Sequence, residues 1–321
     1  IWGKKGAIGI VPPGGDAALC TSHFFLFDIR PGKIEPKYLQ ALFTANYLQE
    51  QLDFEAKGTT GYAAVRPKHV LAAKIPLPPL DEQRRIVARI EELSAKIEEA
   101  RGLRQRAAEE AETLVAARRT ELFEEAMQGK TSRLDQVATL ERGKFSHRPR
   151  NAPRFFGGDH PWIQIGEIEA SNKFIQHWKQ TLNDEGLGIS RKFPRGTVLV
   201  SIAATIGAVG ILDFDCCVPD SIVAIRPRPG TESEYIYHYL GYVRSHLEDI
   251  AHQSAQKNIN LKILSALPVP CVDLPAQHRI VAYLDDLQAK VDSLKRHQEE
   301  TSKELDALMP SILSKAFSGN L

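Results

Sequence analysis

The chain carries the same pattern twice, about 190 residues apart, and this repetition constrains its fold more than any other feature. Residues 75–78 read Ile-Pro-Leu-Pro and stand before a long helical pattern, and residues 267–270, Leu-Pro-Val-Pro, stand before a second one. The helical patterns also end alike, with Ala-Met-Gln-Gly at 126–129 and Ala-Phe-Ser-Gly at 316–319. Each copy is a proline-bounded entry, a long helix and a glycine stop, which predicts internal two-fold pseudosymmetry.

The two helical patterns, at 81–129 and 275–321, have apolar residues every three or four positions. A period of 3.5 residues predicts a narrow apolar stripe that must pair with another helix. Each helix should be roughly 60 Å long at a rise of about 1.5 Å per residue. The second helix must return from the domain that follows the first, so the pair should be an antiparallel coiled coil. The expected stripe comprises Ile86, Ile90, Leu93, Ile97 and Leu114 in the first helix, and Leu284, Leu287, Val291, Leu294 and Leu308 in the second.

The segments outside the helices read as mixed β/α domains. In 130–274, β-branched runs at 162–165, 197–202 and 221–225 predict strands, and 235–250 predicts one amphipathic helix. Residues 1–80 look like the second half of the same kind of domain, because Gly-Ala-Ile-Gly at 6–9 matches Gly-Ala-Val-Gly at 207–210. We therefore expect an N-terminally truncated first domain. The predicted class is α+β, in the order domain, helix, domain, helix.

Composition excludes several functional classes. The formal net charge of +1 gives the whole molecule no polyanion-binding field, so any such binding must come from local patches. The four cysteines lack the spacing of a zinc site or a disulfide framework, and no apolar run approaches the roughly 20 residues of a membrane span, so we expect a cytoplasmic protein. No motif for catalysis, for a metal or for a cofactor is convincing. The chain reads as non-enzymatic.

Recognition chemistry is what remains. Residues 142–154 carry five positive charges and no acid, and their prolines and glycine predict a flexible cationic loop suited to phosphate and base contacts. An ordinary solvated loop is the alternative. An amide-rich stretch at 253–260 and its polar counterpart at 57–62 are weaker signals. Within the basic loop, Arg148 and Arg150 are the strongest candidates. The candidate nucleic-acid contacts are Lys144, Ser146, His147, Arg148, Arg150, Arg154, Gln256, Lys257, Asn258, Lys4, Lys5, Thr59, Thr60 and Arg66.

Taken together, these features resemble the specificity subunit of a type I restriction–modification system. The resemblance rests on Ile-Pro-Leu-Pro-Pro-Leu-Asp-Glu-Gln-Arg-Arg-Ile-Val at 75–87 and Ser-Ile-Leu-Ser-Lys-Ala-Phe-Ser-Gly at 311–319. Leu-Asp-Gln-Val at 134–137 and Gln-Lys-Asn-Ile at 256–259 also fit. The chain departs from the pattern in lacking the front half of the first domain, and its second helix has an entry two residues longer than the first.

The resemblance implies two target recognition domains, at 1–80 and 130–274, held apart by the spacer helices 81–129 and 275–321. Each domain would read one half of a split, asymmetric double-stranded DNA sequence. The expected partners are two methyltransferase subunits that use S-adenosylmethionine, and restriction or motor subunits that use ATP and Mg. The chain itself would bind no cofactor. Two alternatives stay open: the recognition part of a single-chain restriction–modification enzyme, and a coiled-coil scaffold that binds only protein.

Overall fold

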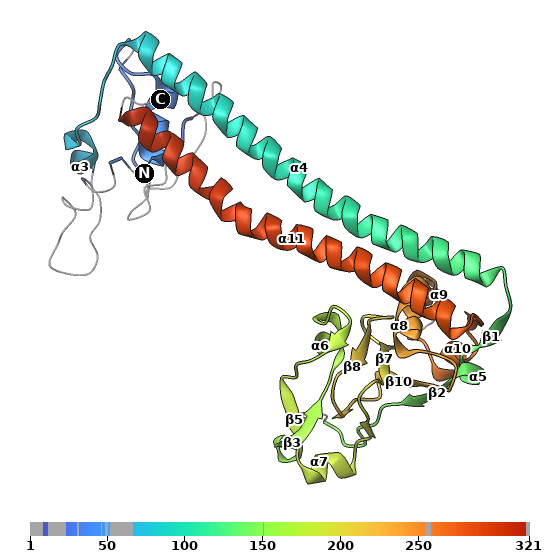
Figure 1. Ribbon diagram of the computed structural model, residues 1–321. Helices are drawn as coiled ribbons and strands as arrows, with labels where there is room; N and C mark the ends of the chain where they lie inside the picture. The colour runs from blue at the N-terminus through green and yellow to red at the C-terminus, as the bar shows by residue number, and fades with distance from the viewer. Residues whose placement is uncertain are drawn as a thin grey trace. The chain divides into compact units, whose positions relative to one another are not determined.

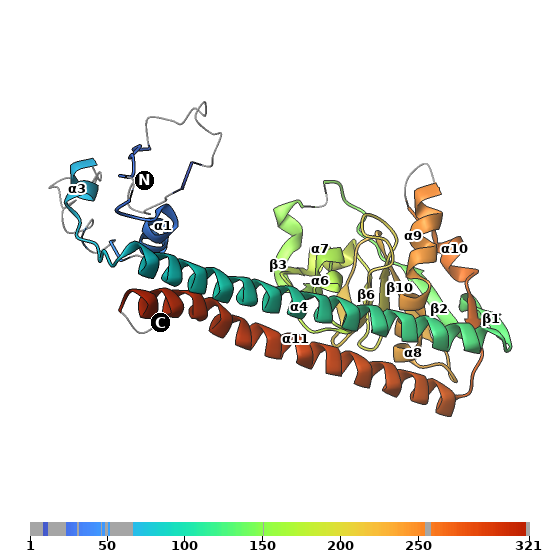
Figure 2. The same cartoon turned by 90° about the horizontal axis from the view of Figure 1, so that it is seen from above.

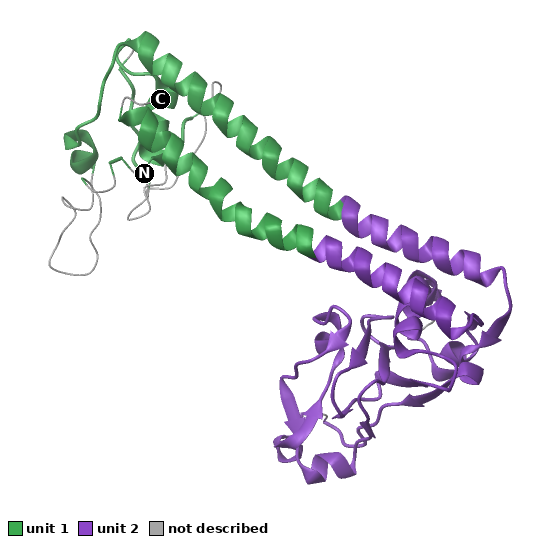
Figure 3. Cartoon of the chain, in the orientation of Figure 1, with its two compact units in different colours: residues 1–109, 293–321 green, residues 110–292 purple. Residues whose placement is uncertain are grey.

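A computed structural model describes residues 9–11, 24–30, 32–45, 47–48, 51, 67–149, 151–253 and 258–318. The chain divides into two compact units, 1–109 with 293–321 and 110–292 (Figure 3). Each unit includes part of two long helices, α4 (Leu80–Met127) and α11 (Leu274–Phe317), which have 48 and 44 residues. The sequence places these helices at 81–129 and 275–321, and the boundary between the compact units falls within both of them.

In the first unit, the start of α4 lies beside the end of α11 (Figures 1 and 2). Ile86 and Ala316 share a buried cluster with Tyr38 of the short helix α1 (Pro36–Thr44). Further along α4, Arg101 forms an ion pair of 2.6 Å with Asp306. Residue numbers therefore rise along α4 where they fall along α11, which confirms the antiparallel pairing. The first unit also holds α3 (Pro67–Ala72).

The buried positions of the helices correct the expected apolar stripe. The Ile86 and Leu284 segments do not pack on each other: Ile86 lies near Ala316 in the first unit, and Leu284 lies in the cluster of Phe123 in the second. Three expected residues are exposed, Leu114 at 48%, Leu294 at 36% and Leu308 at 43%. In α4 the neighbouring Val115 is buried instead of Leu114. A straight α-helix has about 3.6 residues per turn, so a stripe read at a strict 3.5-residue period drifts around the helix along its length.

The second unit is a mixed β/α domain built on two sheets. The five-stranded sheet has the order β2-β10-β7-β8-β4, with β4 and β8 parallel, and the four-stranded sheet has the order β5-β3-β9-β6. Its strands are β2 (Ala138–Arg142), β3 (Phe156–Trp162), β4 (Phe174–Ile175), β5 (Gln180–Leu182), β6 (Lys192–Phe193), β7 (Val198–Ser201), β8 (Val209–Leu212), β9 (Cys216–Cys217) and β10 (Ile222–Pro227). A separate antiparallel pair, β1 (Thr131–Arg133) with β11 (Pro268–Pro270), joins the entry and exit of the domain.

The helices of this domain are short. They are α5 (Leu134–Val137), α6 (Ile165–Glu169), α7 (Asp184–Gly188), α8 (Ser233–Tyr242), α9 (Arg244–Gln253) and α10 (Leu261–Ser265), with a 3-10 turn at Pro153–Phe155. Two expectations need correction. The predicted strand at 162–165 ends at Trp162, and Ile165 already begins α6. The predicted single helix at 235–250 is two helices, α8 and α9, which meet at Val243.

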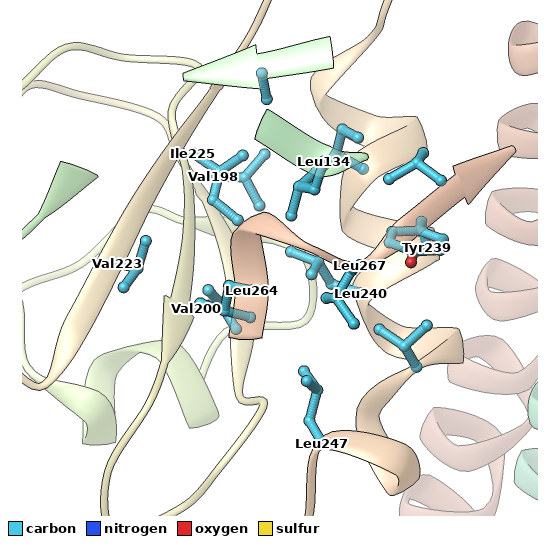
Figure 4. Packing of buried hydrophobic residues seen from close by; sticks show 14 of the residues in the cluster. Leu134, Val198, Val200, Val223, Ile225, Tyr239, Leu240, Leu247, Leu264 and Leu267 are labelled. Atoms are coloured by element: carbon cyan, nitrogen blue, oxygen red, sulfur yellow. The ribbon is translucent and has the colours of Figure 1, made fainter. Parts of the chain in front are cut away.

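The main core lies between one face of the five-stranded sheet and α8, α9 and α10 (Figure 4). Val198 and Val200 face this core, whereas Leu199 between them faces a second cluster with Phe193 of the other sheet. Both faces of β7 are therefore buried, and its continuous β-branched run is typical of a central strand. From α4, Phe123 is fully buried against the ring of Tyr235, with centroids 5.4 Å apart, and so attaches the helix to the domain.

The internal repeat is visible in hydrogen bonds at the start of each long helix. Gln83 is buried, accepts from the Glu35 backbone N–H (2.8 Å) and donates to two backbone carbonyls. Gln277 is also buried, accepts from the Glu232 backbone N–H (2.9 Å) and likewise donates to two carbonyls. Because each amide uses its acceptor and both donors, it ties the entry segment of the helix to the domain before it.

A polar cluster attaches α11 to the globular part of the second unit. Asp285 of α11 accepts from Lys173 Nζ (2.5 Å) and from Nε2 of the buried His238 (2.9 Å). Lys173 also pairs with Glu234 of α8. Burial alone would raise the pKa of Asp285, but its hydrogen bonds with His238 and Lys173 lower that pKa to about 2. The carboxylate is therefore ionised and can only accept hydrogen bonds.

Candidate functional site

The basic loop after β2 is anchored along its backbone. Gly143 N–H donates to the Ile222 carbonyl (2.9 Å) and Lys144 N–H donates to the Val218 carbonyl (3.0 Å). A Cβ at Gly143 would lie 2.2 Å from the Pro219 carbonyl oxygen, so only glycine fits this close approach. Arg142 ends β2 and Pro153 begins the 3-10 turn, and the described residues between them lie outside the helices and strands, as expected. The flexibility of the loop stays a prediction.

Phe145 is the hydrophobic anchor of the loop. It is 2% exposed and packs on Trp162 and Phe155, with ring centroids 5.1 and 5.8 Å away. The loop can therefore present polar side chains on both sides of a buried aromatic residue. His147 lies against Phe155, at 4.7 Å between centroids, and the Arg154 guanidinium lies over the same ring at 4.6 Å.

The candidate side chains of this loop differ in how many hydrogen bonds and ion pairs they already form within the chain. The Arg148 guanidinium donates to the carbonyls of Phe145 (2.6 Å) and His147 (2.9 Å) and forms an ion pair with Asp220 (3.1 Å). Ser146 is exposed, and its backbone N–H donates to the Ile189 carbonyl at 3.1 Å. Lys144 is exposed and forms no ion pair with any residue that the structure describes. Lys144 and Arg154 are thus the cations of the loop most available to a partner.

Most other candidates fall outside the described residues. These are Arg150, Gln256, Lys257, Lys4, Lys5, Thr59, Thr60 and Arg66. Asn258 is described and exposed. The neighbouring Asn260 has a structural role, since its side chain caps α10 by accepting from the Ile263 N–H at 3.0 Å.

A second polar segment, at 172–180, was not predicted. It runs from the end of α6 through the edge strand β4 to β5 and reads Asn-Lys-Phe-Ile-Gln-His-Trp-Lys-Gln. Phe174 and Trp178 are 41% and 45% exposed, and Trp178 is held edge-on against Phe214 at 4.6 Å. Lys179 is exposed and forms no ion pair within the described ranges. Exposed aromatics interleaved with amides and cations suit a nucleic-acid contact, and this interleaving was the available sequence signal.

Carboxylates neutralise the other cations near these two segments. Arg195 pairs with Asp213 at 2.6 Å, and Lys192 lies 3.6 Å from Asp215. Arg226 pairs with Glu141 at 2.5 Å. The positive potential around the basic loop and segment 172–180 therefore comes from cations without a described ion pair, such as Lys144 and Lys179, and not from the total number of basic residues.

The described residues contain no set of three or more His, Cys, Asp or Glu side chains arranged to hold a metal. None of the helices that the structure describes is both long and apolar enough to cross a membrane. Burial raises the pKa values of both the Cys216 and the Cys217 thiols, which disfavours the thiolate form that nucleophilic chemistry needs.

Comparison with known proteins identifies relatives of the whole chain. A family model described as a type I restriction modification DNA specificity domain matches residues 1–106 and again 128–302. The HsdS subunit from Thermoanaerobacter tengcongensis is 30% identical, with a TM-score of 0.65, over 97% of this chain and 77% of that one. A structure reported for complex assembly and conformational transition of the type I R-M system is 30% identical, with a TM-score of 0.76, over 97% and 78%.

Curated relatives are similar over different lengths. The putative type I restriction enzyme MjaX specificity subunit of Methanocaldococcus jannaschii is 20% identical over 317 residues, which cover 89% of this chain and 69% of that protein. The type I restriction enzyme EcoBI specificity subunit of Escherichia coli is 27% identical over 165 residues, which cover 50% of this chain and 35% of the subunit. This chain thus spans about a third of the EcoBI subunit by that match.

Proposed function

The chain belongs to the family of type I restriction–modification DNA specificity subunits, and we propose that it reads a split, asymmetric sequence in double-stranded DNA. The observation that carries this proposal is the double match of the family model, once in each repeat. Two similar but non-identical recognition units on one chain fit a target of two different half-sites. The subunit is non-catalytic, since methylation and cleavage belong to partner subunits in this family.

In the second unit, we assign the DNA contacts to the basic loop 142–154 and the segment 172–180. Lys144 and Arg154 supply exposed cations for phosphates, and Trp178 and Lys179 supply an aromatic face and a further cation. The buried Phe145 and the Trp178–Phe214 contact hold these side chains on a fixed scaffold. Such preorganisation reduces the entropy lost on binding.

We propose that other chains of the complex supply the catalytic activities and their cofactors. Two methyltransferase subunits would bring S-adenosylmethionine, and restriction or motor subunits would bring ATP and Mg. The alternatives of a single-chain restriction–modification enzyme and of a protein-only scaffold are less favoured, because the relatives are named as separate specificity subunits.

Methylation mapping tests the proposal directly. A host expressing this chain with its methyltransferase subunits should acquire methylated sites at a two-part motif with an unspecified gap. Trp178→Ala should weaken or alter one half of the motif and leave the other half unchanged. His246→Ala changes an exposed residue of α9 in the same unit and serves as the control. A continuous motif, or no dependence of methylation on this chain, would contradict the proposal.

A further inference from the structure

A pocket of about 280 Å³ lies within the second unit between α4, α8, the start of α9 and strand β8. Its wall includes Arg119 of α4, Tyr237 and Gly241 of α8, and Arg244 of α9. Ile168 and Glu169 at the end of α6 and Ser171 just after it complete the wall, immediately before segment 172–180. None of the predicted contacts lies in this pocket.

Arg119 lines this pocket as a half-buried side chain whose Nε has no hydrogen-bond partner. Its Nε atom is enclosed and has no hydrogen-bond acceptor, and among the described residues no carboxylate lies within ion-pair distance of the guanidinium. Burial lowers the pKa of Arg119, against the opposing effects of Tyr237 and Glu112. An enclosed cation without a counter-ion is costly in a folded protein. The adjacent Arg118, by contrast, is exposed and paired with Glu121 at 2.5 Å.

The local backbone leaves room for this guanidinium. A Cβ at Gly241 would lie 2.9 Å from Arg119 Nη1, so the absence of a side chain there lets the guanidinium approach α8. Gly207 has a positive φ of 72°, and a Cβ there would lie 2.9 Å from Cγ of Arg244. Two glycines thus accommodate the two arginines that line one pocket.

The second guanidinium is only partly engaged. Arg244 Nε donates to Glu248 (2.9 Å) one turn along α9, and Arg244 also lines the pocket. The one carboxylate in the pocket wall belongs to Glu169, which is exposed and does not pair with either arginine. Both arginines line one cavity. A tetrahedral oxyanion is a suitable ligand for such a pair, because each guanidinium presents a planar fork of N–H donors.

We propose that this pocket binds a phosphate group between Arg119 and Arg244. The source that fits the proposed function is a backbone phosphate of the bound duplex, and in that respect the inference rests on the proposed function. Free inorganic phosphate offers the same chemistry. The site would hold the DNA backbone beside segment 172–180 and would not itself distinguish one base from another.

Thermal unfolding of the 321-residue chain tests the pocket without DNA. Inorganic phosphate, titrated against chloride at constant ionic strength, should raise the Tm of the unaltered chain, because a ligand that binds only the folded state stabilises it. We expect a rise of about 2–4 °C, which is the shift that a modest stabilisation produces in a domain of roughly this size. Arg119→Met should abolish the phosphate-specific rise and leave the Tm in chloride unchanged or higher. Arg118→Met is the matched control and should retain the full phosphate effect.

DNA binding by the complex with methyltransferase subunits distinguishes the source of the phosphate. If the duplex supplies it, Arg119→Met should lower the slope of log affinity against log salt by about one unit. A phosphate-specific Tm rise with an unchanged slope supports a site for free phosphate. Equal Tm values in phosphate and chloride, with an unchanged slope, overturn the proposal.

A third outcome also overturns the phosphate proposal. Arg119→Met could abolish binding of the methyltransferase subunits while phosphate leaves the Tm of the unaltered chain unchanged, which would indicate that Arg119 pairs with a carboxylate of a partner subunit. If the unaltered complex fails to bind DNA at all, the proposed function fails, and the thermal experiment still decides the pocket.

Discussion

At the residue scale, the structure separates cations that are free to bind from cations that hold the fold. Lys144 is exposed and unpaired among the described residues, whereas Arg148 is bonded to two carbonyls and to Asp220. Both belong to one short basic loop, and the sequence ranked Arg148 and Arg150 above the others. The contacts instead indicate that Arg148 shapes the loop. Arg150 lies outside the described residues and stays a prediction.

We expect Lys144→Ala to weaken DNA binding by removing one phosphate contact. The slope of log affinity against log salt should fall by about one unit, with the sequence preference and the Tm unchanged. Arg148→Ala should instead lower the Tm, because two carbonyls and one carboxylate lose their donor. Salt titrations and thermal melts of both variants check this. Equal Tm losses in the two variants would show that the distinction is wrong.

His238 gives the second unit a predictable response to acid. Burial lowers the pKa of His238 below its usual 6.5, although the hydrogen bond with Asp285 opposes the shift. The unfolded chain therefore takes up this proton first as the pH falls. Stability due to neutral His238 is fully present above about pH 6.5 and is lost progressively below it. The contribution of ionised Asp285 persists until the pH falls below 3.8 toward its folded value of about 2.

The corresponding prediction concerns urea unfolding near pH 7.5 and about pH 5.5. The free energy of unfolding should fall between these values, and His238→Gln should reduce the fall, because an amide can still donate to Asp285 without titrating. His246→Gln changes an exposed histidine of α9 and should preserve the full pH dependence. An identical pH dependence in all three chains would exclude His238 as the cause.

At the scale of elements, the long helices combine apolar and polar contacts. In the first unit, Arg104 donates to the Gln298 carbonyl and to Thr301, and Gln298 Nε2 donates back to the Arg104 carbonyl at 3.1 Å. A polar layer within an apolar stripe specifies which residues face each other, since a shift along the helix would leave these groups unpaired. Arg104 and Gln298 are polar residues at positions where the apolar period of each helix would place an apolar one, and they contact each other.

Replacing stripe residues should reveal which of them are core. Leu284 is fully buried, so Leu284→Ala should destabilise the chain by about 2–5 kcal/mol. Leu294 is 36% exposed, so Leu294→Ala should cost less than about 1 kcal/mol, although the heptad pattern treats both alike. Denaturant unfolding of the two variants provides the comparison. Similar losses would support the original stripe.

At the scale of the whole molecule, each long helix passes from one compact unit into the other. If the helices set the gap between the two half-sites, inserting about four residues near Ala107 should add roughly 6 Å of helix. The gap in the methylated motif should then grow by about two base pairs at roughly 3.4 Å each, with both half-sites retained. The naturally longer first helix supports tolerance of such an insertion. Full activity at the original gap would show that the length of the helices does not set the distance between the two half-sites.

The sequence by itself determined the repeat, the two long helices and their direction, because periodic patterns are local and the second helix must return from the domain that follows the first. It also indicated the family, since the phrases before and after each helix are distinctive. It missed the boundary between α8 and α9, because both segments are amphipathic and only packing places the break at Val243.

Tertiary structure alone decided which of these residues are buried, paired or free. Val115 is buried and Leu114 exposed, although the heptad pattern selects Leu114, because burial depends on the segments that pack on α4 and the pattern of one helix does not include them. Gln83 and Gln277 accept equivalent hydrogen bonds from backbone N–H groups 48 and 45 positions away, and only the folded chain brings these groups together. Arg148 forms an ion pair with Asp220, whereas Arg119 Nε has no hydrogen-bond partner. The sequence does not separate the two, because the groups that surround a guanidinium come from segments distant in the chain.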